Sequence, residues 1–182
     1  PYGINVVKGE SLGQGHGVDY QVLYKEVKND NSTDTAKKNY EIIKDLTENQ
    51  IIFGGNYFTD FLPPSRCWIV WDKEVTAGSY ADFEMAWTSF DKNAKIYKWI
   101  WNGFTRKGEI KEEGKGRVHP TQKPVGLFKE IIKDFSGEND LVLDSFAGSG
   151  TTLLACEALG RQCLAVEYEE FYCNFILERW EN

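Results

Sequence analysis

Between Pro124 and Gly137, apolar residues recur every three to four positions, with polar residues between them. This spacing predicts a helix with one apolar face. Its apolar positions are Leu127, Phe128, Ile131, Ile132 and Phe135. Proline favours the first turn of a helix, and glycine favours the position just past its end. The helix should therefore begin at Pro124 and stop at Gly137.

Strand-like and helix-like segments then alternate to the end of the chain. LVLD at 141–144 and QCLAVE at 162–167 are short apolar runs typical of buried strands. Helical patterns cover 151–159, closed by Gly160, and 171–180. This alternation predicts an α/β fold with a mostly parallel sheet and helices on both of its faces.

The first half of the chain is richer in strand-like aromatic runs. Tyr40, Ile43 and Leu46 follow a helical spacing. The strand-like runs are QIIFGG at 50–55, CWIVWD at 67–72 after the Pro63-Pro64 break, EMAWTSF at 84–90 and KIYKWIWNGF at 95–104. Trp99 and Trp101 share one face of the last run, which favours packing in the core over stacking on a base.

Two polar segments interrupt these patterns. The glycine-rich stretch from Lys8 to Gly17 predicts a mobile loop, either a closing loop over a bound strand or a plain connector. From Thr105 to Gly116 the hydrophobic pattern vanishes, which predicts an exposed loop.

Composition adds bounds to this picture. A length of 182 residues, with 41% hydrophobic and 27% charged residues, predicts one soluble domain over 1–182. No apolar run approaches a membrane span and no signal peptide opens the chain. The four cysteines form no C-x-x-C pair, which favours reduced thiols in a cytoplasmic protein and no metal site. The net charge of −7 argues against polyanion binding by the whole surface.

The stretch VLDSFAGSGTTLL at 142–154 is a glycine turn between a strand and a helix. Such turns often bind phosphate, but a phosphate loop needs lysine after the glycine, where this chain has Thr151. The dinucleotide fingerprint also fails, because Leu153 occupies its third glycine position.

Two acidic residues close consecutive strands around this turn. Asp144 would repel a pyrophosphate but suits an ammonium or sulfonium group. Glu167, 23 residues later, is placed to bind ribose hydroxyls. A positively charged nucleoside without phosphate, S-adenosylmethionine, satisfies both. The structural alternative is a tight strand-to-helix turn with a threonine cap.

Three motifs resemble those of the amino-group DNA methyltransferases. DSFAGSGTT at 144–152 follows HPTQKP at 119–124 and precedes AVEYEEFY at 165–172. The tripeptide PYG at 1–3 resembles the tail of the family's Asp/Ser/Asn-Pro-Pro-Tyr/Phe catalytic motif. The order, with the catalytic motif first and the cofactor motifs last, resembles the permuted beta class.

The resemblance implies a Rossmann-like, S-adenosylmethionine-dependent methyltransferase fold and a set of site residues. The cofactor-binding residues would be Asp144, Phe146, Gly148 and Gly150 on the methionine side, Glu167 at the ribose, and Thr121, Gln122 and Lys123 closing the site. Pro1 and Tyr2 would be catalytic, with Tyr2 stacking on a target base rotated out of double-stranded DNA.

The sequence begins at the third position of the catalytic motif, without its acceptor residue. Either the sequence starts inside a longer chain, which the missing initiator methionine favours, or the protein lacks the acceptor. PYGIN resembles the Asp-type motif, so adenine N6 is expected over cytosine N4 as the target. A catalytically silent DNA- or cofactor-binding remnant and an enzyme acting on RNA or a small molecule are the alternatives.

Local charge supports a DNA interface near residues 102–123. Six basic and three acidic residues give this segment a charge of +3 (six minus three). The resemblance places a short target-recognition insertion at 103–118, with Arg106, Lys107, Lys115 and Arg117 as DNA-binding residues. So short an insertion implies a short or partly degenerate site. The resemblance implies a restriction-modification enzyme encoded by a bacterium, an archaeon or a phage. A homodimer is compatible with this expectation.

Overall fold

The computed structural model of the chain describes residues 2–4, 11–13, 22–24, 28–75, 81–101 and 119–181. The chain forms two compact units, Pro1–Arg106 and Lys107–Asn182. The prediction of one domain over 1–182 stays a prediction.

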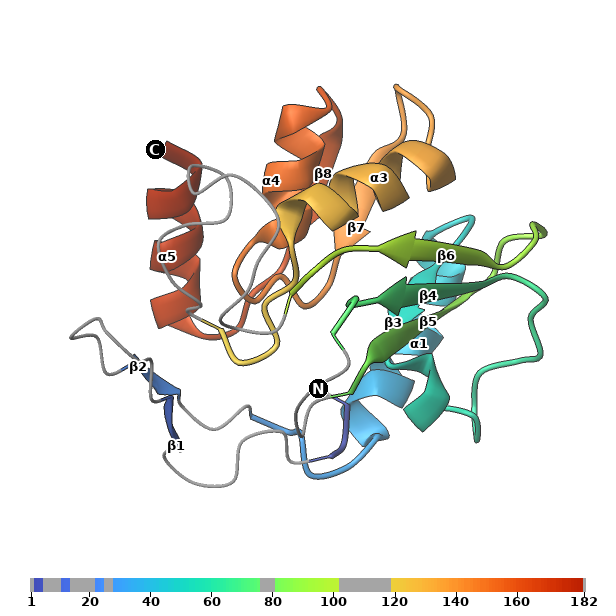
Figure 1. Ribbon diagram of the computed structural model, residues 1–182, viewed down its shortest axis with the longest axis horizontal. Helices are drawn as coiled ribbons and strands as arrows, with labels where there is room; N and C mark the ends of the chain where they lie inside the picture. Colours follow the sequence, from blue (N-terminus) through green and yellow to red (C-terminus); the bar gives the residue numbers. More distant parts are fainter. Residues whose placement is uncertain are drawn as a thin grey trace. The chain divides into compact units, whose positions relative to one another are not determined.

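A four-stranded sheet forms the centre of the first unit (Figure 1). Its strands are β3 (Ile51–Phe53), β4 (Trp68–Asp72), β5 (Phe83–Thr88) and β6 (Lys95–Lys98), in the order β3-β5-β4-β6. β5 runs antiparallel to both of its neighbours, whereas β6 runs parallel to β4. It follows that β3, β4 and β6 share one direction and that β5 alone opposes them. The four predicted strands are confirmed.

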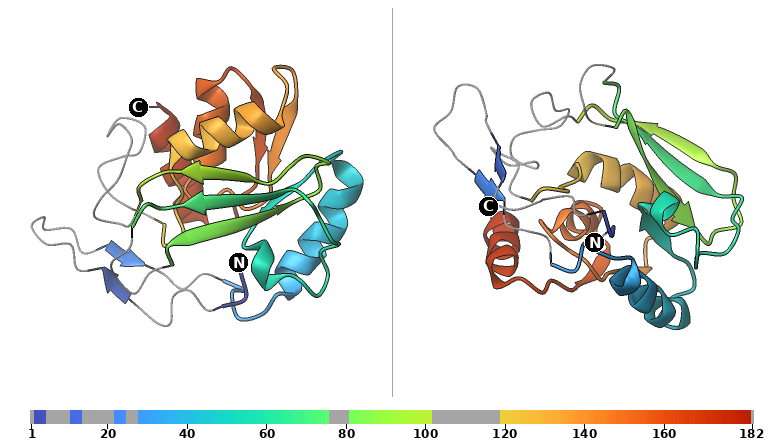
Figure 2. Two further views of the ribbon diagram at one scale, coloured as in Figure 1. Left: turned by 45° about the vertical axis from the view of Figure 1, so that its right-hand side comes forward. Right: turned by 90° about the horizontal axis from the view of Figure 1, so that it is seen from below.

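Helix α1 (Asp34–Leu46) packs on this sheet through Tyr40 (Figure 2). The Tyr40 ring meets Trp87 edge-on at 5.9 Å between centroids, in a cluster with Phe58 and Leu62. The predicted helix is confirmed, although its last residue, Leu46, is 70% exposed. The chain turns away after Leu46, where Thr47 is extended, so the last turn of the helix lies beyond the cluster.

Two features of the first unit bear on other predictions. Strands β1 (Ser11–Gly13) and β2 (Val22–Tyr24) pair antiparallel, so part of the glycine-rich stretch from Lys8 to Gly17 is a strand; its other residues lie outside the described ranges.

Trp99 and Trp101 follow β6 and are 9% and 4% exposed. Their assignment to the core is confirmed.

The second unit contains a parallel β–α–β arrangement (Figure 1). Strand β7 (Leu141–Asp144) leads through α4 (Thr151–Ala158) to β8 (Gln162–Ala165), which pairs parallel with β7. α3 (Val125–Phe135) packs on α4 through a cluster that contains Val125, Ile132, Ala155 and Cys156. The chain closes with α5 (Glu170–Glu181). The predicted helices and strands, and the α/β class, are confirmed.

In the part of the chain that the structure describes, no helix has the length and apolar content needed to cross a bilayer.

Candidate functional site

The glycine turn lies at the carboxyl ends of β7 and β8. Asp144 pairs with Ala165 at the end of the ladder. The Val166 amide then donates to the Asp144 carbonyl at 2.8 Å, and the Ala147 amide donates to the Val166 carbonyl at 2.9 Å. These bonds fold the turn over both strand ends, which is where ligands bind in open α/β sheets.

Glycine is required in this turn for two reasons. Gly150 has φ +77°, a conformation that side chains disfavour. In addition, a Cβ on Gly150 would lie 2.9 Å from Cγ1 of Ile176 in α5. The second glycine therefore gives α5 its close approach to the turn.

The carboxylates of Asp144 and Glu167 both reach this turn. Asp144 accepts from the Phe146 amide at 3.0 Å through Oδ1 and from the Thr152 hydroxyl through Oδ2. Glu167 accepts from the Gly148 amide at 2.7 Å through Oε2. Residues at the ends of two strands thus hold the backbone between them from opposite sides.

These carboxylates keep capacity for a ligand. The Glu167 Oε1 atom accepts from the amides of Tyr168 and Glu169 at 2.8 and 2.9 Å, whereas among the described residues Oε2 accepts from Gly148 alone. A carboxylate has about four acceptor positions. Two negative charges beside the turn favour hydroxyl or cationic groups and disfavour phosphate.

The segment 119–124 packs against the same turn. A Cβ on Gly148 would lie 3.5 Å from Nε2 of His119, so the imidazole covers this glycine. The Thr121 amide donates to Nδ1 of His119 at 3.2 Å, and the Thr151 hydroxyl donates to the Lys123 carbonyl at 2.9 Å. The start of α3 is therefore tied to the start of α4.

Gln122 and Lys123 are largely enclosed in this arrangement, at 4% and 9% exposure. The Lys123 ammonium donates to the Thr121 carbonyl at 3.4 Å. The side chain of Lys123 is thus buried, whereas a simple helix cap would leave it in solvent. Phe146, in contrast, leaves 45% of its surface exposed on the turn.

All the predicted cofactor residues gather at this turn within the second unit. They are Thr121, Gln122, Lys123, Asp144, Phe146, Gly148, Gly150 and Glu167. Their assignment to a cofactor stays a prediction.

Helix α5 also contributes to the surroundings of the turn, in contacts that the sequence does not predict. Its Tyr172 ring lies 4.6 Å from the His119 ring, between centroids. A guanidinium nitrogen of Arg179 donates to the Ser149 carbonyl at 2.9 Å. No local pattern indicates these contacts, although Arg179 is the basic residue of the last helical turn.

Cys156 and Cys163 lie behind the turn, on α4 and β8. Their hydrogen bond, together with burial, raises the pKa of the Cys163 thiol well above its usual range, while the same bond lowers that of Cys156. All four cysteines are free, as predicted. Among the described residues, no group of three or more His, Cys, Asp or Glu side chains is placed to hold a metal ion.

The predicted catalytic residue Tyr2 lies in the first unit and is half-buried. Its ring is 6.2 Å from that of Tyr57 and 6.5 Å from that of Phe58, between centroids. A Cβ on Gly54 would lie 2.6 Å from Cδ1 of Tyr2, so the ring rests on the glycine that follows β3. Pro1 lies outside the described residues.

The predicted DNA interface lies outside the described residues as well. This holds for the insertion at 103–118 and for Arg106, Lys107, Lys115 and Arg117.

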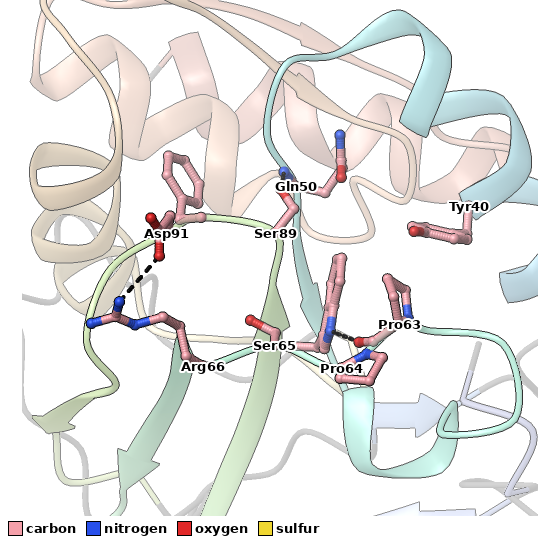
Figure 3. Close-up of a pocket in the computed structure, with 10 residues that line it drawn as sticks. Tyr40, Gln50, Pro63, Pro64, Ser65, Arg66, Ser89 and Asp91 are labelled. Carbon is pink, nitrogen blue, oxygen red and sulfur yellow. Dashed lines mark hydrogen bonds and ion pairs between the residues drawn. The ribbon is translucent and has the colours of Figure 1, made fainter.

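A pocket of about 280 Å³ lies elsewhere in the first unit (Figure 3). Gln50, which lines it, precedes β3, whereas Gly54 beneath Tyr2 follows β3. The pocket and Tyr2 are therefore at opposite ends of that strand. At its rim Arg66 pairs with Asp91 at 3.3 Å.

Curated proteins with similar sequences are Type II methyltransferases. The chain is 30% identical over 145 residues to the Type II methyltransferase M2.LlaDCHI of Lactococcus lactis subsp. cremoris, covering 79% of this chain and 52% of that protein. It is 33% identical over 135 residues to the Type II methyltransferase M2.MboI of Moraxella bovis, covering 73% and 47%. The chain spans about half the length of these curated relatives.

Solved structures show the same fold. M1.HpyAVI matches with a TM-score of 0.54 and 26% identity, over 80% of this chain and 81% of that one. The M1.HpyAVI-SAM complex matches with a TM-score of 0.52 and 27% identity, over 74% of each chain. The predicted Rossmann-like methyltransferase fold is confirmed.

The family model described as DNA methylase (N6_N4_Mtase) matches residues 18–178, far more than half of the chain. The acidic residues at the strand ends and the glycine turn that they bond are consistent with this match. The chain belongs to the N6/N4 DNA methylase family.

Proposed function

We propose that the protein transfers a methyl group from S-adenosylmethionine to an exocyclic amino group of a base in double-stranded DNA, with adenine N6 favoured over cytosine N4. The observation that carries this proposal is the pair of carboxylates, Asp144 and Glu167, that hold one glycine turn and keep acceptor positions. The SAM complex of the related M1.HpyAVI supports the choice of cofactor.

The residues at the turn fit this cofactor. Glu167 would accept hydrogen bonds from the ribose hydroxyls through Oε2, whose one bond in the structure comes from Gly148. Asp144 would face the positively charged methionine end. The exposed Phe146 ring offers an apolar wall. When bound, S-adenosylmethionine supplies an electrophilic methyl group on its sulfonium.

On the target side, Tyr2 would stack on the rotated base. Such stacking contributes about 1–3 kcal/mol per base. The amine lone pair is delocalised into the base, so acceptors that bond the amino hydrogens would favour a more pyramidal, more nucleophilic nitrogen. Preorganised acceptors also stabilise the positive charge that develops there. In the motif that PYG resembles, this role belongs to the first residue, Asp, Ser or Asn.

The basic residues Arg106, Lys107, Lys115 and Arg117 would contact DNA phosphates. The relatives in Lactococcus lactis and Moraxella bovis are bacterial proteins. We therefore expect action on DNA in a bacterial cytoplasm. Assembly as a homodimer stays a prediction.

The test is transfer of labelled methyl groups from S-adenosylmethionine by the full-length protein to duplex DNA of mixed sequence, followed by mapping of the modified bases. N6-methyladenine would support the proposal, and N4-methylcytosine would support the alternative target. A protein that binds the cofactor by calorimetry but labels no DNA would be a silent remnant. Stronger labelling of competing RNA would move the substrate to another class.

A further inference from the structure

Asp30 holds the backbone at Tyr2. One oxygen of its carboxylate accepts hydrogen bonds from two successive amides, those of Tyr2 and Gly3, the second at 2.9 Å. Asp30 is only 4% exposed and lies 28 residues from Tyr2 in the sequence. Successive amides around one anion form a nest, and hydrogen bonds to a charged acceptor are about twice as strong as neutral ones. The contact is a specific long-range anchor.

The same loop also docks against the residues that follow Asp30. Gly3 has φ +72°, and a Cβ on it would lie 2.7 Å from the carbonyl carbon of Ser32. Only a glycine allows the two backbones to approach this closely. Asp30 and Ser32 precede α1, so the anchor connects the Tyr2 loop to the start of that helix.

On its other side, the Tyr2 ring rests on the first unit's sheet. It covers Gly54 at the end of β3 and lies beside Phe58, which is 2% exposed. The backbone is thus fixed by Asp30 while the ring is fixed by a buried aromatic cluster. Together these contacts define both the position and the tilt of the ring.

We infer that Asp30 is a positioning residue for the methyl-transfer reaction, acting through Tyr2. This inference rests on the proposed function, in which the Tyr2 ring stacks on the target base. In this role Asp30 sets where the Tyr2 ring lies, through its hydrogen bonds to the Tyr2 and Gly3 amides. Displacement of a catalytic group by about 1 Å can cost roughly a hundredfold in rate.

The experiment compares D30A, D30N, Y2A and the double variant D30A/Y2A in the full-length protein. D30A should lower kcat at least about tenfold, whereas the dissociation constant for S-adenosylmethionine, measured by calorimetry, should stay unchanged. D30N keeps an acceptor oxygen and should recover most of kcat. If Asp30 affects the reaction through the Tyr2 ring, the double variant should be no slower than Y2A.

Two further variants control for folding. D45A removes an exposed aspartate from α1, the helix that follows Asp30, and should keep normal turnover. G3A leaves Asp30 unchanged, but the added Cβ would clash with the backbone of Ser32 and displace the Tyr2 loop. This variant should therefore reproduce the kcat loss of D30A. If D30A does not fold, D30N and G3A carry the test: a kcat loss in G3A with recovery in D30N supports the inference.

Normal kcat in D30A and G3A, with Y2A slow, would overturn the role of Asp30 and leave the proposed function intact. Additive losses in D30A/Y2A would overturn it as well. Normal turnover in Y2A would remove Tyr2 from the active site and the inference with it.

Discussion

Asp144 both holds the glycine turn and, in our proposal, faces the positive charge of the cofactor. Asp144→Asn separates these roles, because the amide oxygen can still accept from the Phe146 amide and the new NH2 group can donate to the Thr152 hydroxyl, while the charge is lost. We expect S-adenosylmethionine affinity to fall about tenfold or more, equivalent to about 1.4 kcal/mol, as measured by calorimetry.

The control for this prediction is Glu157→Gln, which removes an exposed charge from α4. It should leave the affinity unchanged. Full affinity in Asp144→Asn would show that the carboxylate serves the turn alone.

Gly150 and Gly160 allow backbone strain and steric contact to be measured apart. Both have positive φ, +77° and +64°, but only Gly150 has a neighbour, Ile176, within reach of an added Cβ. Gly160→Ala should cost about 1–2 kcal/mol of unfolding free energy. Gly150→Ala should cost about 1–3 kcal/mol more, because α5 must shift.

Denaturant unfolding of both variants gives the comparison. Adding Ile176→Ala to Gly150→Ala should remove the clash, although it also costs buried apolar surface. Equal losses of unfolding free energy in Gly150→Ala and Gly160→Ala would mean that α5 shifts at no cost in free energy.

At the scale of elements, α1 is held by one residue more than by a face. Tyr40 is buried against Trp87, whereas Leu46 is 70% exposed. Tyr40→Ala should lower the unfolding free energy by about 3 kcal/mol, as for other buried aromatic residues. Leu46→Ala should change it by less than about 0.5 kcal/mol. Thermal and denaturant unfolding measure both changes. Equal losses of unfolding free energy would mean that Leu46 stabilises the helix as much as Tyr40 does.

Short-range patterns predict these elements well for a physical reason. The strands, the helices around Pro124 and Thr151, and the glycine turn each depend on neighbours in sequence. Asp144 and Glu167 could be placed together because parallel strands end at one edge of a sheet. The sites of Asp30 and Arg179 could not be predicted, since their partners lie 28 and 30 residues away and no spacing rule connects them. The exposure of Leu46 likewise depends on where the sheet ends.

At the scale of the whole molecule, we expect charge distribution to govern the proposed encounter with DNA. The chain carries −7 overall, whereas residues 102–123 carry a local excess of positive charge. We expect duplex affinity to fall steeply with salt, with a slope of about −0.9 in log K against log salt for each phosphate contact. Arg117→Ala should reduce the size of that slope by about one.

A titration of fluorescent duplex across salt concentrations measures these slopes. Lys133→Ala, a cationic change in the last turn of α3, serves as the matched control and should leave the slope unchanged. An unaltered slope in Arg117→Ala would place the DNA elsewhere on the protein.

Helix α5, the last helix, makes three contacts around the glycine turn. Tyr172 lies on His119, Ile176 fills the space above Gly150, and Arg179 bonds the carbonyl of Ser149. Cleavage between Glu178 and Arg179 would leave every predicted cofactor residue in place, yet remove one of these three contacts. For truncation, tagging or fusion, α5 should therefore be treated as part of the predicted site.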